Sequence, residues 1–294
     1  MNDILNILRG LAESSGDYDF KTNASINVIP TRIMSLDDAL GIGGIPRGYI
    51  THIAGDSYTG KSVLSWHVAK SVVSSGGVVA IADMDRSTDP KYVESICKHT
   101  ENLVFIRCKS IFDIHRALTV CAENNIDLFV IDSIASPPEA SGFDPADLGR
   151  LLDSVSGSNM ALILTNQDRH TRNGDAPLYS RILDIIAPIT IYLSYKHAIE
   201  SGGNVTGHET EISILRNRFT GIKDPVQLRL IYGEGFDVVD AMIDPMIRRG
   251  SITRKGSWYQ IGEEIFFGRE QTREAMRRDG FCTDPRPYHI LSKR

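Results

Sequence analysis

The chain has 294 residues, of which 41% are hydrophobic and 23% charged, with a formal net charge of −5. This length and composition predict one large globular domain with a smaller unit attached, and they argue against general disorder. The apolar start of the chain carries Asp3 and Arg9, and no long uncharged apolar run follows, so we expect neither a membrane span nor a cleaved signal peptide. The four cysteines form no CxxC pair, which argues against a disulfide scaffold or a zinc module and favours a reducing cytoplasm.

The charge is unevenly distributed along the chain. Residues 246–294 contain eleven Lys or Arg and six Asp or Glu, a net charge of +5, so the remainder carries −10. An acidic total therefore does not exclude nucleic-acid binding, because only the charge that faces the phosphates matters. The same arginines are equally compatible with a solvated helix face, and charge alone does not decide between the two.

A short amphipathic helix is predicted at the start of the chain, followed by a polar linker and a short strand at 26–29. Four aliphatic residues form one stripe at helical spacing: Ile4, Leu5, Leu8 and Leu11. From residue 35 strands alternate with helices, which is typical of a mostly parallel, twisted α/β sheet with helices on both faces. We expect strands at 49–54, 77–82, 103–106, 128–131 and 161–164, and helices at 61–74, 111–123 and 147–154.

The pattern changes near residue 187, where strands follow one another without intervening helices. They are predicted at 189–195, 211–215 and 226–231, with a hairpin-type turn at 201–204. Beyond residue 235 a small α/β unit is expected.

Two long connections leave the carboxyl ends of neighbouring predicted strands, at 136–146 and 168–180. Connections of this length in a compact domain are usually functional or disordered. Open α/β sheets bind their ligands at the carboxyl ends of their strands. We therefore expect both connections to be functional loops.

Residues 55–62 match the phosphate-binding pattern GxxxxGK[ST] at every fixed position, between a predicted strand and a predicted helix. Loop amides and the helix N-terminus would surround the β-phosphate. Lys61 would neutralise β- and γ-phosphate charge, and Ser62 would offer its hydroxyl to Mg²⁺. The predicted ATP-binding residues of this loop are Gly55, Asp56, Ser57, Tyr58, Thr59, Gly60, Lys61, Ser62 and Val63.

Acidic residues end two further predicted strands. Asp132 follows the apolar run 128–131 and is the second expected contact for Mg²⁺. Hydrolysis also needs a carboxylate that orients the attacking water. Asp85 is the candidate, Asp83 is the alternative, and a solvated strand end would explain the same residues.

Further motifs occur in a fixed order along the chain. They are 35–41 with 43–48, 83–85 with 89–92, Thr165-Asn166-Gln167, Arg216-Asn217-Arg218, 232–235 and 256–259. Together with the phosphate loop they resemble the RecA family of recombinases over residues 31–268.

The resemblance implies roles for single residues. Asp89 and Tyr92 would contact adenine, and Gln167 would sense the γ-phosphate. Arg216 and Arg218 would reach the ATP of a neighbouring subunit. The implied catalytic residues are thus Asp85, Lys61, Gln167, Arg216 and Arg218.

Each of these residues also has a structural interpretation. Asp89 would equally cap a helix, Gln167 would end a strand, and the arginines would lie on a solvated edge. Because the two arginines are two apart on a predicted strand, we expect both to project from one face, with Asn217 opposite.

Single-stranded DNA would lie along the second loop, 167–181, whose basic side chains and amides can follow phosphates without reading sequence. The candidate residues are Arg169, His170, Arg172, Asn173, Gly174 and Arg181. The first loop, 136–147, is acidic, and Phe143 is its candidate wedge between bases.

Several positions depart from the family pattern. Asp85 replaces a glutamate, arginines replace the paired lysines, the 136–158 stretch is shorter than in bacterial members, and the acidic C-terminal tail is absent. The chain resembles a divergent, compact member, RecA-like or UvsX-like, of bacterial or phage origin.

The expected organisation is a RecA-like P-loop ATPase core at 35–235 and a small C-terminal domain at 236–294. Residues 1–34 would dock subunits together, with 26–29 extending a neighbour's sheet; alternatively the first helix folds back on its own core. The resemblance implies a cytoplasmic, DNA-dependent ATPase that uses ATP and Mg²⁺. It would form helical filaments on single-stranded DNA and exchange strands with double-stranded DNA in recombination and repair, with single-strand-binding and loader proteins as partners. A ring-forming helicase-like motor and a non-catalytic ATP-switched filament mediator are the alternatives.

Overall fold

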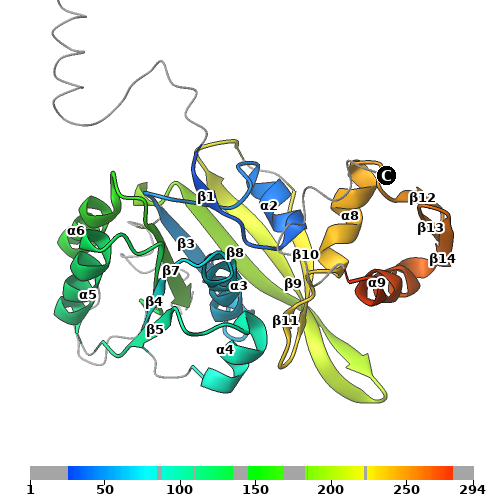
Figure 1. The fold of residues 1–294 in the computed structure, drawn as a ribbon, viewed down its shortest axis with the longest axis horizontal. Helices are drawn as coiled ribbons and strands as arrows, with labels where there is room; N and C mark the ends of the chain where they lie inside the picture. The colour runs from blue at the N-terminus through cyan, green and yellow to red at the C-terminus, as the bar shows by residue number, and fades with distance from the viewer. Residues whose placement is uncertain are drawn as a thin grey trace, which may run out of the picture.

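The computed structural model describes residues 26–84, 88–108, 110–134, 145–167, 183, 185–221 and 224–280. Within these ranges one nine-stranded sheet has the order β11-β10-β9-β8-β3-β7-β6-β4-β5 (Figure 1). Its strands are β3 (Ile50–Gly55), β4 (Val79–Asp83), β5 (Leu103–Ile106), β6 (Leu128–Asp132), β7 (Ala161–Gln167), β8 (Ile189–Ser201), β9 (Asn204–Asn217), β10 (Val226–Ile231) and β11 (Gly235–Phe236).

Strands β3 to β8 pair in parallel, and β8 to β11 pair in antiparallel fashion. Helices cover both faces, so the central strands are buried on both sides and consist of nearly continuous apolar residues. One face packs against α3 (Lys61–Val73) and α4 (Pro90–Cys97), and the other against α5 (Ile111–Glu123) and α6 (Pro145–Val155). The predicted α/β architecture is confirmed.

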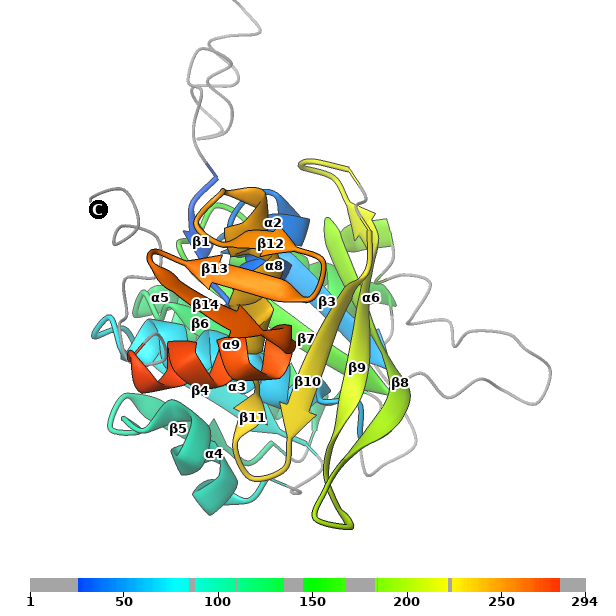
Figure 2. The same ribbon diagram turned by 90° about the vertical axis from the view of Figure 1, so that its right-hand side faces the viewer.

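Strands β8 and β9 are longer than predicted. They continue as a hairpin that projects past the rest of the sheet (Figure 2). Cross-strand contacts join the two strands: Lys196 forms an ion pair with Glu211 at 2.9 Å, and His197 Nε2 lies 3.4 Å from Glu209 Oε2. The predicted turn at 201–204 joins the two strands.

The segment before the phosphate loop forms local structure within the chain. Strand β1 (Val28–Ile29) pairs with β2 (Ile45–Pro46), so the strand expected at 26–29 is shorter and hydrogen-bonds inside its own subunit. The pairing with β2 occupies one edge of β1, and the extension of a neighbour's sheet by residues 26–29 stays a prediction. Helix α2 (Met34–Leu40), which the sequence analysis did not identify, follows. The helix predicted at the start of the chain lies outside the described residues.

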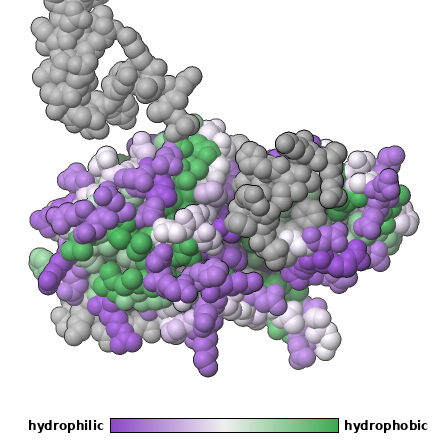
Figure 3. All heavy atoms as spheres, in the orientation of Figure 1, coloured by the Kyte–Doolittle hydropathy of each residue, from purple (hydrophilic) through white to green (hydrophobic). Residues whose placement is uncertain are grey.

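The C-terminal unit contains α8 (Asp240–Arg248), strands β12 (Thr253–Lys255), β13 (Trp258–Ile261) and β14 (Glu264–Phe267), and α9 (Gly268–Arg278). The three strands form their own antiparallel sheet, so the α/β unit predicted beyond residue 235 is confirmed as far as residue 280. In the space-filling view its α9 side is strongly hydrophilic, whereas apolar residues reach the surface over the core (Figure 3).

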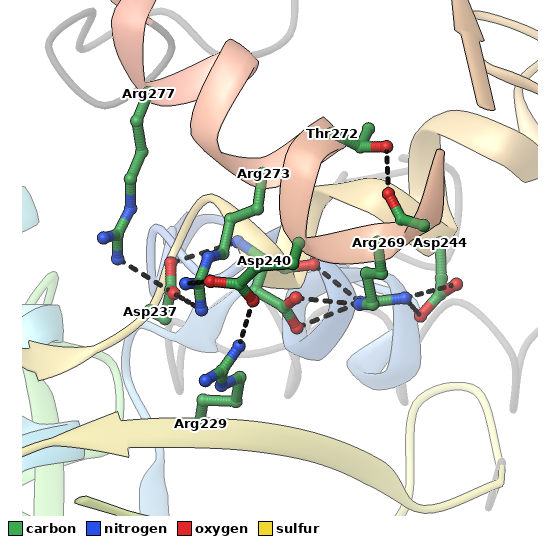
Figure 4. Close-up of polar contacts among 10 residues, drawn as sticks. Arg229, Asp237, Asp240, Asp244, Arg269, Thr272, Arg273 and Arg277 are labelled. Atoms are coloured by element: carbon green, nitrogen blue, oxygen red, sulfur yellow. Dashed lines mark hydrogen bonds and ion pairs between the residues drawn. The ribbon is translucent and has the colours of Figure 1, made fainter. Parts of the chain in front are cut away.

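A network of arginines and carboxylates joins this unit to the core (Figure 4). Asp237 accepts from Arg273 at 3.2 Å and pairs with Arg277 at 2.9 Å. Arg229 of β10 bridges to Glu270 of α9 at 3.1 Å. The contacts connect β10, the start of α8 and α9, and therefore fix the unit against the sheet. No helix within the described ranges is long and apolar enough to cross a membrane.

Candidate nucleotide-binding site

The backbone of the phosphate loop requires glycine at two positions. Gly55 has φ 149° and Gly60 has φ 94°. A Cβ on Gly55 would lie 2.2 Å from the carbonyl oxygen of Leu193, and one on Gly60 would lie 2.8 Å from Leu230 Cδ1. The two fixed glycines of the motif therefore let β8 and β10 pack directly against the loop.

Lys61 begins α3 and turns back into the loop. Its Nζ donates to the carbonyl oxygens of Gly55 at 3.0 Å and Asp56 at 2.5 Å. The buried Thr59 donates from Oγ1 to Asp56 O at 2.9 Å. The ammonium group is thus held at the centre of the loop, where it can exchange carbonyl oxygens for phosphate oxygens.

The remaining loop residues surround this centre. Asp56 and Ser57 are exposed, Ser62 is half-buried in the first turn of α3, and Val63 packs in the core. Tyr58 has φ 64° and is 94% exposed. The structure therefore presents one open, predominantly backbone-lined loop at the start of a 13-residue helix, as anion binding at a helix N-terminus requires.

The strand register aligns the carboxyl ends beside the loop. Asp83 pairs with Asp132 across β4 and β6, and Gly55 pairs with Gln167 across β3 and β7. Asp132 Oδ1 accepts from Thr165 Oγ1 at 2.5 Å. This carboxylate and the Ser62 hydroxyl supply hard oxygen donors suited to Mg²⁺, which usually keeps waters and substrate phosphates as its other ligands. Asp85 lies outside the described residues.

Gln167 contacts the phosphate loop directly. Its Nε2 donates to Ser57 Oγ, and it is the last residue of β7. The expected loop 168–180 begins at the next residue. The loop residues proposed for DNA (Arg169, His170, Arg172, Asn173, Gly174 and Arg181), together with Phe143, lie outside the described residues.

The other side of the site is formed by α4 and the turn after β10. Asp89 caps α4, accepting from Lys91 N at 3.0 Å, so the helix-cap interpretation is confirmed. Tyr92 packs edge-on against Trp66 with ring centroids 5.2 Å apart. Burial raises the pKa of its phenol, and the nearby Tyr232 adds to the effect.

Sequence reasoning assigned Tyr232 no role, although it belongs to the 232–235 motif. Ser95 of α4 donates to Gly233 O at 2.7 Å, which ties this turn to α4. Only the tertiary fold brings Tyr92 and Tyr232 together, because they are far apart in sequence.

The two arginines are arranged differently from the prediction. Strand β9 ends at Asn217, so Arg218 is the first residue beyond it, and a bulge at Leu215 places Arg216 opposite Thr190. The buried Asn217 donates to Leu40 O at 2.9 Å. Arg218 Nη2 donates to Ile185 O at 2.6 Å.

Their place in the sheet is informative. Strands β3 and β8 are parallel, so their amino ends lie on the same side of the sheet. Thr190 lies at the amino end of β8. The phosphate loop follows the carboxyl end of β3, where Gly55 pairs with Leu193 of β8. Arg216 and Arg218 therefore lie toward the opposite end of the strands from the phosphate loop of their own subunit.

A groove lies elsewhere on the described part of the chain. It has a volume of 1430 Å³, is bordered by α2, β10, α8 and α9, and includes no residue of the loop 55–62. Its charged side chains are largely paired, as with Asp38 and Arg249 at 2.5 Å. This groove and the phosphate loop are therefore separate surface features.

Comparison with known proteins gives a consistent result. The family model described as "RecA N-terminal domain" matches residues 15–141. The protein named "Protein RecA" from Aquifex pyrophilus is 29% identical over 275 residues, which is 85% of this chain and 78% of that protein. The protein of the same name from Rubrobacter xylanophilus is 29% identical over 291 residues, covering 92% of this chain and 84% of that protein. Among solved structures, "Crystal structure of the RadB recombinase" superimposes with a TM-score of 0.56 at 20% identity, covering 71% of this chain and 98% of that chain.

Proposed function

We propose that the chain is a member of the RecA family and a cytoplasmic, ATP-dependent DNA strand-exchange protein. It assembles into filaments on single-stranded DNA, pairs that strand with homologous double-stranded DNA, and hydrolyses ATP to release it. Single-strand-binding and loader proteins are proposed as its partners.

One contact carries the proposal. Gln167 donates to Ser57 of the phosphate loop and directly precedes the basic segment 168–181. A γ-phosphate entering the loop competes for the Gln167 amide and shifts the end of β7. Nucleotide state is thereby transmitted to the residues proposed to hold DNA, in the manner of a switch segment that reads a γ-phosphate.

The proposal includes the following roles in hydrolysis. Lys61 neutralises the β- and γ-phosphates, and Ser62 and Asp132 hold Mg²⁺. Asp85 orients the attacking water, with Asp83 as the alternative. The base lies between Tyr92 and Tyr232, and Asp89 accepts from its exocyclic amine.

Arg216 and Arg218 act on a neighbour's nucleotide in this proposal. Their position toward the amino ends of the strands removes them from the phosphate loop of their own subunit. A guanidinium supplied across an interface stabilises transferring phosphate charge only in the assembled state. Hydrolysis is therefore coupled to assembly.

ATP turnover with and without single-stranded DNA tests the proposal. We expect DNA to stimulate the wild-type chain, whereas Gln167→Ala keeps ATP binding and loses the stimulation. Gln260→Ala, in the C-terminal sheet, is the matched control. Wild-type turnover that is indifferent to single-stranded DNA would contradict the proposed function.

A further inference from the structure

Three aromatic rings form a ladder beside the nucleotide-binding site. Tyr195 of β8, His208 of β9 and Tyr232 after β10 lie in succession, with ring centroids 5.3 Å and 5.7 Å apart. The two tyrosines are half-exposed, at 51% and 53%, whereas His208 between them is only 2% exposed. A titratable ring is thus buried beneath two accessible ones.

His208 contacts Tyr232 through a polar atom as well as through its ring face. Its Nδ1 lies 3.3 Å from the Tyr232 hydroxyl, while its buried Nε2 has no hydrogen-bond partner among the described residues. Burial lowers the pKa of the imidazole, so the ring is neutral and can serve the phenol as donor or acceptor, depending on its tautomer.

The ladder is attached to the phosphate loop at two points. Thr210 is two residues beyond His208 and thus on the same face of β9, and its Oγ1 donates to Thr59 O at 3.2 Å. Leu230, which pairs with His208 across β9 and β10, lies against Gly60. The position of Tyr232 relative to the phosphates is therefore set through β9 and β10.

We infer that His208 is a positioning residue for the nucleotide, holding the Tyr232 ring in the orientation in which it forms one wall of the base site. The inference rests on the proposed function and deepens it. His208 does not touch the nucleotide; it acts through the hydroxyl and ring face of Tyr232. Without His208 the half-exposed phenol of Tyr232 loses its polar partner and its packing. The base then binds against a less ordered Tyr232 ring.

The test compares two ligands, ATP and inorganic tripolyphosphate, by calorimetry in the full-length protein with Mg²⁺. His208→Ala is expected to weaken ATP binding about tenfold while tripolyphosphate binding stays within twofold. KM for ATP rises by a similar factor and kcat is unchanged, because the phosphate contacts remain. His208→Asn restores a polar partner for the hydroxyl and recovers part of the affinity.

Controls separate this role from general damage. His197→Ala, on the exposed part of the same hairpin, leaves both affinities unchanged. Tyr232→Phe keeps the ring and removes the hydroxyl, so it reproduces part of the His208→Ala effect even if His208→Ala is insoluble. Equal weakening of ATP and tripolyphosphate, or no weakening of either, would overturn the inference. A wild-type protein that binds neither ligand would overturn the proposed function itself.

Discussion

At the scale of single residues, the position of Lys61 in the helix and its hydrogen bonds both direct its ammonium group into the phosphate loop. It is the first residue of α3, and its ammonium is held by two carbonyl oxygens of the loop that precedes it. Motif spacing alone predicted its place, because the strand, loop and helix are contiguous in sequence.

Lys61→Ala is expected to abolish ATP hydrolysis and to weaken nucleotide binding by at least tenfold, since the cation facing the β- and γ-phosphates is lost. Turnover with Mg²⁺ and binding of a labelled ATP analogue measure both effects. Lys255→Ala, on an exposed strand of the C-terminal sheet, is the control. Wild-type turnover in Lys61→Ala would show that the loop does not hold the reacting phosphates.

His67 of α3 offers a prediction about pH. Its buried Nε2 accepts from Phe236 N at 3.0 Å, and burial, with smaller effects of Lys70 and Arg32, lowers its pKa to about 3 from 6.5. The unfolded chain therefore takes up a proton at His67 near pH 6.5, whereas the folded chain does not. The free energy of unfolding should fall as pH drops from about 6.5 toward 3, by about 1.4 kcal/mol per pH unit from this residue.

His67→Gln retains an acceptor for Phe236 N but cannot titrate. Denaturant unfolding at pH 7, 5.5 and 4 should accordingly show a shallower pH dependence in the variant than in the wild type. Parallel curves for the two proteins would mean that His67 is not the neutral buried imidazole described above.

Three residues show which features of the site could be predicted from the sequence and which could not. Gln167 was placed correctly because it ends a predicted strand. Tyr232 was not given a role, since only the fold brings it near Tyr92, and most strands of the sheet separate the two residues in the sequence. Arg218 was assigned to a strand because nothing in the local sequence shows that β9 ends at Asn217 or that a bulge at Leu215 precedes Arg216.

Secondary structure elements were predictable where local signals are strong. Helix α5 has its expected bounds, 111–123, because Ser110 and Asp113 form a capping box at its start. The outer halves of β8 and β9 were missed because their residues, such as Lys196 and Glu200, are exposed and lack the apolar alternation of a buried strand.

The join between α9 and the core gives a prediction at the element scale. The Asp237 side chain is 1% exposed, pairs with Arg273 and Arg277, and accepts from Asp240 N at 3.1 Å. Asp237→Ala removes the acceptor for Asp240 N and leaves the buried Arg273 with only Glu270, so the free energy of unfolding of the C-terminal unit should fall by about 3 kcal/mol.

Urea unfolding followed by Trp258 fluorescence, in a Trp66→Phe background, reports on this unit. Glu270→Ala is the matched control. Because the Glu270 side chain is 56% exposed, this variant should lower the free energy of unfolding by less than about 1 kcal/mol. Equal losses in the two variants would contradict a dominant role for Asp237.

At the scale of the whole molecule the account requires neighbouring subunits. Arg216 and Arg218 lie toward the opposite end of the strands from the phosphate loop of their own chain, and we propose that the complete ATPase site forms between two copies. Residues 1–25 and most of the two proposed DNA loops lie outside the described residues, so their roles in assembly and DNA binding stay predictions.

Mixing two inactive variants tests the shared site. Lys61→Ala and the double variant Arg216→Ala/Arg218→Ala should each lack DNA-stimulated turnover, and mixed filaments should regain part of it, because some interfaces combine an intact loop with intact arginines. Lys61→Ala mixed with Lys61→Ala/Arg218→Ala is the control that cannot recover. No recovery at any ratio in verified mixed filaments would place the arginines outside the reaction.

Electron microscopy of the full-length protein with single-stranded DNA, Mg²⁺ and a slowly hydrolysed ATP analogue tests the central claim most directly. The account predicts continuous helical filaments that form with the analogue and are absent with ADP. Closed rings would indicate the helicase-like motor. Dispersed monomers with nucleotide and DNA both present would contradict the proposed assembly and the shared ATPase site.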